Sequence, residues 1–249
     1  MKRGSGSNLK NLSAILFWVA VWHILALCMD NFLLIPTPLQ VLRRMGELMV
    51  TADFWRITAV SIGRILLGVV WAMALGIVLG MLSAVSAPAD ALIAPVMTAV
   101  QATPVASFAI LVQLWLNRNY VPVLICGMMV LPVVWSNVCT GIRETDAQLL
   151  ELAKVYRLPG LRILKRIYVP SVLPYFRAAC GSALGLAWKA GIAAEVLTVP
   201  KESMGRMISE AKLYLLTEDL FAWTLCVVIL SLLLQKIMLR LLTGRDVHA

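Results

Sequence analysis

The sequence has little charge for its length. Of its 249 residues only 14% are charged, whereas 61% are hydrophobic. Soluble domains are about a quarter charged and just under half apolar. A soluble fold of this size can bury only part of so much apolar surface. The composition therefore excludes an ordinary water-soluble enzyme and indicates a protein that lies in lipid.

Patterns typical of metal, disulfide and nucleotide sites are also missing. The five cysteines include no CxxC pair, and we interpret them as small buried hydrophobic side chains. The two histidines lie at opposite ends of the chain, and no HExxH, GxSxG or P-loop motif is present. We therefore expect no catalytic residue, no metal site and no cofactor bound by this chain.

The net charge of +9 does not indicate a nucleic-acid-binding protein. No soluble segment interleaves aromatic and basic residues in the way that stacks bases. If the N-terminus is cytoplasmic, most lysines and arginines fall in cytoplasmic segments, with the pair Arg43 and Arg44 as the main exception. This positive-inside bias predicts that both termini are cytoplasmic and that nucleic acid is not a partner.

Six long runs carry few or no charges, and a membrane-spanning helix needs about 20 mostly apolar residues. The runs are 11–29, 65–89, 91–117, 119–142, 169–199 and 220–242. The first run resembles a cleaved signal peptide in its basic flank, but it is longer than such a segment and ends without a small-x-small cleavage site, so we expect it to be retained. The sequence predicts an all-α polytopic membrane protein with about six transmembrane helices, folded as one domain over residues 1–249.

Two details within the runs predict how the helices pack. Gly76 and Gly80 place two small residues on one helix face, which lets a neighbouring helix approach closely. Pro104 removes a helical hydrogen bond directly after Gln101 and Thr103. This polar break is interpreted either as part of a water-accessible path or as a packed kink.

Ionisable residues at membrane depth are candidates for function, because removing them from water is costly. Lys189 and Glu195 lie in the run 169–199, six residues apart and therefore on different helix faces. Arg64, near a run end, is expected to reach the interface. We hypothesise that Gln101, Thr103, Lys189 and Glu195 line a translocation path. The alternative is structural pairing within the bundle.

Two shorter segments outside the runs have helical periodicity. Residues 39–50 predict an amphipathic helix that is too short and too charged to span. Residues 200–219 also have apolar residues at roughly helical spacing, which predicts a helix that connects two of the runs.

The segment 144–168 is too polar to span and has two apolar stripes at helical spacing. They are separated by Leu158-Pro159-Gly160, which predicts two short amphipathic helices joined by a turn. An exposed helix pair with an apolar face usually binds a partner. The alternative is a hairpin that rests on lipid headgroups.

Within this segment, Glu151-Leu152-Ala153 is followed at a fixed distance by Ile167-Tyr168-Val169-Pro170. The arrangement resembles the cytoplasmic EAA loop of the membrane subunits of binding-protein-dependent ABC importers, whose pattern is EAA, three residues, Gly, nine residues and I-x-L-P. Residues 34–38, 61–64, 187–188 and 194–195 are similar to permeases of the nitrate, sulfonate and taurine type.

The loop departs from the family pattern at three positions. Leu152 replaces the first Ala, Arg157 replaces the central Gly, and Val169 replaces the Leu before the final Pro. Glycine permits a turn that a residue with a Cβ resists. We therefore expect Pro159 and Gly160 to supply the turn instead.

The resemblance implies a type I ABC importer permease. In that family the loop is a coupling helix seated in a groove of a separate cytoplasmic ATP-binding subunit, which uses the ATP. The other implied partners are a second permease copy or homologue and an extracytoplasmic substrate-binding protein, and the implied location is the bacterial inner membrane. The resemblance also implies that a helix in the region 200–219 lies on the outer side, where it either helps to receive the binding protein or simply connects two spans. The coupling residues implied by the resemblance are Glu151, Leu152, Ala153, Tyr156, Arg157, Gly160, Ile167 and Pro170.

The expected function is therefore that of a permease subunit, without an ATPase site of its own, which forms the path for a small solute. Two alternatives are considered. An ATP-independent secondary transporter or channel would not need the polar helical loop and often has paired half-repeats. A membrane enzyme would need a cluster of catalytic groups.

Overall fold

A computed structural model of the chain describes residues 5–28 and 35–243, and all of its regular structure is helical. Residues 1–4, 29–34 and 244–249 lie outside the described residues, and with them position 29 of the first predicted run and position 34 of the family resemblance. The elements are α1 (Ser5–Cys28), α2 (Pro38–Met49), α3 (Ala52–Val85), α4 (Ala87–Ala102), α5 (Val105–Val112), α6 (Val121–Arg143), α7 (Ala147–Val155), α8 (Gly160–Ile163), the π-helical turn η1 (Leu164–Tyr168), α9 (Val169–Thr198), α10 (Met204–Leu213) and α11 (Thr217–Thr243).

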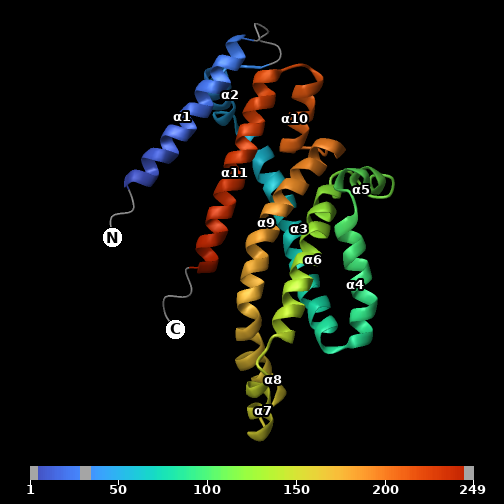
Figure 1. Ribbon diagram of the computed structural model, residues 1–249. Coiled ribbons are helices and arrows are strands. Elements are labelled where there is room, and N and C mark those ends of the chain that lie inside the picture. The colour runs from blue at the N-terminus through green and yellow to red at the C-terminus, as the bar shows by residue number, and fades with distance from the viewer. Residues whose placement is uncertain (1–4, 29–34, 244–249) are drawn as a thin grey trace.

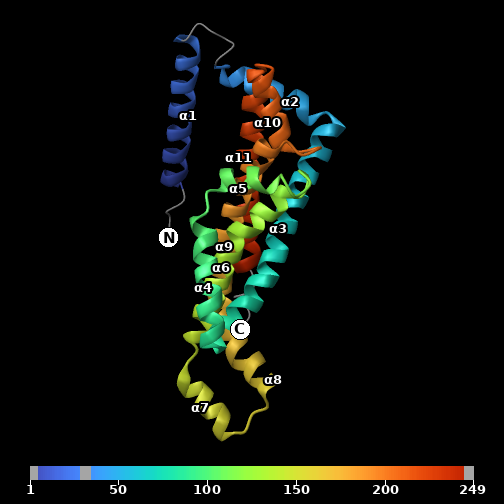
Figure 2. The ribbon, with the colours of Figure 1, turned by 90° about the vertical axis from the view of Figure 1, so that its right-hand side faces the viewer.

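The long helices run side by side as a bundle with short elements at its two ends (Figure 1). Helices α7 and α8 project from one end, which we name the α7 end, and α2 and α10 gather at the other, which we name the α10 end. Figure 2 shows the same arrangement from the side, with the α7–α8 segment reaching beyond every other element. The predicted all-α class is confirmed.

Helices α3 and α6 pack closely because glycines line the contact. A Cβ placed on Gly76 would lie 2.9 Å from the Cβ of Val134, and one on Gly80 would lie 2.9 Å from the Trp135 carbonyl oxygen. The predicted packing role of Gly76 and Gly80 is therefore confirmed. The main apolar core lies between α3, α6, α9 and α11.

The six-span count is not confirmed. Among the described residues, three helices are long and apolar enough to cross a membrane, namely α3, α6 and the Thr217–Ile237 part of α11, or four spans if α4 and α5 together form one. Helix α9 has 30 residues, but its second half is rich in alanine and glycine and carries Lys189, and its last turn carries Glu195. Among the described residues of α1, Leu16–Cys28 forms an apolar stretch that is shorter than a span.

The predicted single run 91–117 is divided into two helices, α4 and α5, which are bent by 100° relative to each other. Thr103 is extended and Pro104 caps α5. Proline has no N–H to continue the helix and disfavours the helical conformation of the residue before it. The break is thus much sharper than a kink, and this segment is either a broken span or a re-entrant loop.

The predicted amphipathic helix 39–50 is confirmed as α2. Its first turn is fixed by a capping box between Thr37 and Gln40. Arg44 forms an ion pair with Asp219 at the start of α11 and another with Glu47. The hydrogen bond to Asp219 raises the pKa of Arg44, and the bond from Arg44 lowers the pKa of the exposed Glu47. Helix α2 is therefore attached to the bundle at the α10 end.

Candidate functional site

Helix α7 presents an apolar stripe to its surroundings. Its start is capped by Asp146, whose side chain accepts a hydrogen bond from the amide of Gln148 at 2.8 Å. Leu152 is 54% exposed and Tyr156 is 71% exposed, and Leu149 and Val155 continue the same face. Such a stripe, on an element that projects beyond the bundle (Figure 2), is a surface suited to a partner.

The remaining coupling residues implied by the resemblance occupy different environments. Glu151 and Arg157 are exposed beside the stripe, whereas Ala153 is only 2% exposed and therefore belongs to the loop's own packing. Gly160 is exposed at the start of α8, Ile167 is half-buried in η1, and Pro170 is exposed at the start of α9. The structure thus gathers the motif in one loop and separates its exposed members from its buried ones.

Arg157 makes the turn that ends α7. Its φ is 48°, in the left-handed region. The amide of Leu158 donates to the Ala153 carbonyl at 2.9 Å and the amide of Arg157 donates to the Lys154 carbonyl at 3.0 Å, which together form a Schellman motif. The expectation that Pro159 and Gly160 would supply this turn was wrong, because the left-handed position is the one at which the family has glycine.

Replacing Arg157 by glycine is expected to stabilise this turn. A non-glycine residue in the left-handed region costs about 1 kcal/mol or more. Amide hydrogen exchange at Leu158 should therefore slow by about fivefold, which corresponds to about 1 kcal/mol. Arg157→Ala is the matched control, because it removes the side chain but keeps a Cβ and should not slow the exchange. Faster exchange in Arg157→Gly than in Arg157→Ala would contradict this account.

The second predicted helix of the loop is not a separate element. Helix α8 continues through η1 directly into α9, so the expectation of two short helices was wrong at this end. The physical reason is Pro170, which has no N–H to donate to the carbonyl of Arg166. Here the amide of Val169 donates to the Leu164 carbonyl in the π-helical turn, and local π-helical adjustments of this kind satisfy the backbone groups that a proline frees.

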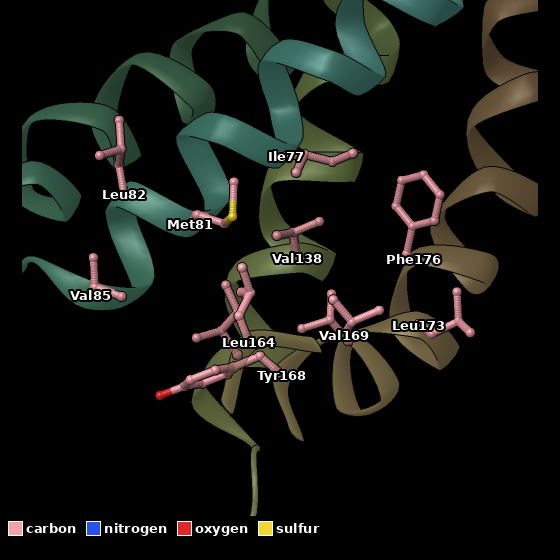
Figure 3. A pocket seen from close by; sticks show the side chains of 12 residues that line it. Ile77, Met81, Leu82, Val85, Val138, Leu164, Tyr168, Val169, Leu173 and Phe176 are labelled. Atoms are coloured by element: carbon pink, nitrogen blue, oxygen red, sulfur yellow. The ribbon is translucent and has the colours of Figure 1, made fainter. Parts of the chain in front are cut away.

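An apolar groove lies where this continuous helix meets the bundle (Figure 3). Its volume is about 380 Å³. Leu164, Tyr168 and Val169 approach it from the loop side, while Ile77 and Val138 contribute from α3 and α6. The groove therefore lies between the base of the loop and the α7-end termini of α3 and α6.

The proposed path residues do not share one environment. Gln101 is exposed at the end of α4, Thr103 is half-buried in the break, and Lys189 is exposed on α9. Glu195 is 0% exposed and accepts hydrogen bonds from Ser61 and from the amide of Gly205. Lys189 and Glu195 lie on different faces of α9, as their spacing predicts. The hydrogen bonds of Glu195 fit the alternative hypothesis of structural pairing within the bundle.

Several partners of Glu195 were not identified from sequence. Ser61 and Gly205 lie 134 and 10 residues from Glu195 along the chain. Arg64 does not simply reach the interface, because its guanidinium donates to the carbonyls of Lys201 and Glu202. The only available signal was that residues 61–64 and 194–195 both belong to the family resemblance.

Comparison with known proteins identifies the family. The family described as binding-protein-dependent transport system inner membrane component matches residues 72–244. The chain belongs to this family. Its helices and this family description agree that the permease is a multi-pass membrane protein.

The permease is similar to several curated relatives. It is 25% identical to the putative aliphatic sulfonates transport permease protein of Bacillus subtilis, over 82% of this chain and 74% of the relative. It is 22% identical to the taurine transport system permease protein of Escherichia coli, over 86% and 80%. A bicarbonate transport system permease protein of Synechocystis is 31% identical over 64% of this chain and 56% of the relative. The permease is therefore a subunit of a binding-protein-dependent ABC importer, of the type I fold and the nitrate, sulfonate and taurine type, and forms the path for a small solute.

Proposed function

We propose that the α7–α8 loop docks a separate cytoplasmic ATP-binding subunit, and that this subunit, not the permease, hydrolyses the ATP. The observation that supports the proposal best is the exposed apolar stripe of Leu149, Leu152, Val155 and Tyr156 on a projecting helix. An amphipathic helix whose apolar face has no partner within its own chain is suited to a groove on another protein.

The surroundings of the stripe favour a specific protein partner over a lipid surface. Glu151, Lys154 and Arg157 are exposed beside it, and charges of both signs at the edge of an interface fix register and orientation. The Schellman turn at Arg157 already holds α7 in place, so less conformational entropy is lost when the loop docks.

The same loop is connected to the core in a way that transmits movement. Helices α8 and α9 are continuous through η1, so displacement of the loop moves α9. The groove beside Leu164 and Tyr168 leaves room for that displacement. Helix α9 has 30 residues and is about 45 Å long at 1.5 Å per residue. It therefore extends from the loop to the opposite end of the bundle.

The α7 end is proposed to face the cytoplasm of a bacterial cell, with both termini on that side. Arg162, Lys165 and Arg166 are exposed at this end, in accordance with the positive-inside rule. Helix α10 would then face the substrate-loaded binding protein. A second permease copy or homologue completes the path, for which Gln101 and Thr103 at the α4–α5 break and Lys189 on α9 remain the proposed lining residues.

Reconstitution tests the proposal. The permease, its partner ATP-binding subunits and the binding protein are placed in proteoliposomes, and uptake of the solute that the binding protein carries is measured. Uptake is expected only with ATP and active ATP-binding subunits. The control is an ATP-binding subunit that binds but does not hydrolyse ATP, which should assemble and give background uptake. Full uptake without any ATP-binding subunit would contradict the proposal.

A further inference from the structure

Glu195 lies at a corner where three helices meet. Its side chain is 0% exposed. Its Oε2 accepts a hydrogen bond from the Ser61 hydroxyl of α3 at 2.8 Å and one from the Gly205 amide of α10 at 3.2 Å. Its Oε1 is 3.6 Å from a guanidinium nitrogen of Arg64. A carboxylate at such a depth is tolerated only where partners of this kind are held in place.

Two of these partners also bind the turn between α9 and α10. Arg64 donates to the Lys201 carbonyl at 2.6 Å and to the Glu202 carbonyl at 3.2 Å. The Ser61 hydroxyl accepts a hydrogen bond from the Met204 amide at 2.9 Å. The helical turn of α3 that holds Ser61 and Arg64 therefore contacts Glu195, the connection between α9 and α10, and the first residue of α10.

The backbones of α9 and α10 are in direct contact at the same point. A Cβ placed on Gly205 would lie 2.5 Å from the backbone carbonyl carbon of Glu195. A distance this short cannot be relieved by moving a flexible side chain. Helix α10 is thus seated on the last turn of α9 without room for a larger residue.

The turn itself is held in an unfavourable conformation. Val199 has a φ of 47° and Glu202 a φ of 50°, and left-handed backbone is especially unfavourable for a β-branched residue. Such conformations persist where the surroundings over-determine them, and they cluster at functional positions. Here the surrounding contacts are those of Glu195, Ser61 and Arg64.

The connection between α5 and α6 is attached to the same corner. The side-chain amide of Gln113 donates to the Thr198 carbonyl at 3.0 Å, and the Lys201 amide donates to the side chain of Asn119 at 3.0 Å. The end of α9 is therefore joined by polar contacts to α3, to α10 and to the segment between α5 and α6.

From these contacts we propose that Glu195 is the positioning residue of a buried clamp, made with Ser61, Arg64 and Gly205, that joins α9 and α10 into one rigid lever. The inference rests on the proposed function, because α9 begins at the coupling loop. Movement that the ATP-binding subunit gives to the loop is carried by α9 to the opposite end of the bundle, where the clamp forces α10 to move with it.

A distance measurement tests whether the lever is rigid. Spin labels are attached at Ser182→Cys on α9 and Lys212→Cys on α10, both exposed, in a Cys28→Ser background because the other four cysteines are buried. Labelled permease is diluted with unlabelled permease in the assembled importer. The distance between the labels is expected to be the same without nucleotide and with ATP trapped. A change in this distance between the two states would overturn the proposal.

Coupling is tested with Glu195→Gln, which keeps the size of the side chain but removes its charge, and with Gly205→Ala. Both are expected to lower the stimulation of ATPase activity by loaded binding protein about tenfold, within the range usual for coupling between sites. The basal ATPase rate and co-purification with the ATP-binding subunit should be unchanged. Gly181→Ala is the matched control on α9, since a Cβ there meets nothing within 4 Å.

The outcomes separate the clamp from the proposed function. Stimulation at the wild-type level in Glu195→Gln would overturn the clamp, and this variant decides alone if Gly205→Ala does not assemble. Loss of ATP-binding-subunit association in the wild-type permease would instead contradict the proposed function.

Discussion

Replacing Leu152 by aspartate is expected to abolish ATP-driven uptake by removing the ATP-binding subunit from the permease. Leu152 lies in the middle of the exposed stripe of α7 and is 54% exposed, so the new carboxylate is well solvated in the free permease and does not disturb its core. In the complex the same carboxylate would be buried against apolar groups. A central position of this kind contributes about 2–4 kcal/mol to an interface, so affinity should fall about 30-fold to several hundredfold.

The measurement is the affinity of the detergent-solubilised permease for its ATP-binding subunit. Leu213→Asp is the matched control, because Leu213 is 74% exposed on α10 at the opposite end of the bundle. It receives the same substitution and should leave the affinity unchanged. Equal affinities for the Leu152→Asp and wild-type permeases would show that the stripe does not contact the ATP-binding subunit, as expected of a hairpin that rests on lipid headgroups.

Replacing Gly68 by valine is expected to destabilise the bundle strongly. A Cβ on Gly68 would lie 2.6 Å from the Val123 carbonyl oxygen and 2.7 Å from the Cβ of Cys126. Both atoms are fixed by helix α6, so the two helices would have to separate. Overpacking of this kind costs about 1–3 kcal/mol and sometimes more, and we expect a cost of about 3 kcal/mol or more because a backbone atom is involved.

Gly63→Val on the same helix is the matched control, since a Cβ at Gly63 meets nothing within 4 Å. Both variants carry the same β-branched residue, so any difference in helix propensity cancels. The yield of monodisperse protein and the unfolding midpoint in detergent should fall for Gly68→Val and change little for Gly63→Val. Similar midpoints for the two variants would mean that the α3–α6 contact is looser than the structure indicates.

The sequence alone determined those features that depend on local pattern. Low charge and long apolar runs indicated a chain that lies in lipid. The runs were expected to be helical, because a helix satisfies the hydrogen bonds of its own backbone where water is absent. The periodicity of 39–50 predicted α2, and Gly76 and Gly80 predicted a close helix contact. The spacing from Glu151 to Pro170 identified the family, which the comparisons confirm.

The number of spans and the course of the segment 91–117 were harder to predict from the sequence. Apolar length alone does not distinguish a helix that crosses the membrane from two helices that meet at 100°. Proline marks where a helix is interrupted, but the angle at the interruption depends on the neighbours that pack against each half. The same limit applies to Pro170, where the helix continues through a π-helical turn instead of ending.

Only the tertiary structure decided the environment of individual residues. Ala153 and Leu152 are neighbours in one motif, yet one is buried and the other is exposed, because they lie on different faces of α7. Arg157, at the position where the family pattern has glycine, is in the left-handed region because the hydrogen bonds that end α7 require it. Glu195 has its polar partners on α3 and α10. The charge of Glu195 could be recognised from sequence, but its role depends on contacts between residues 134 positions apart, which only folding brings together.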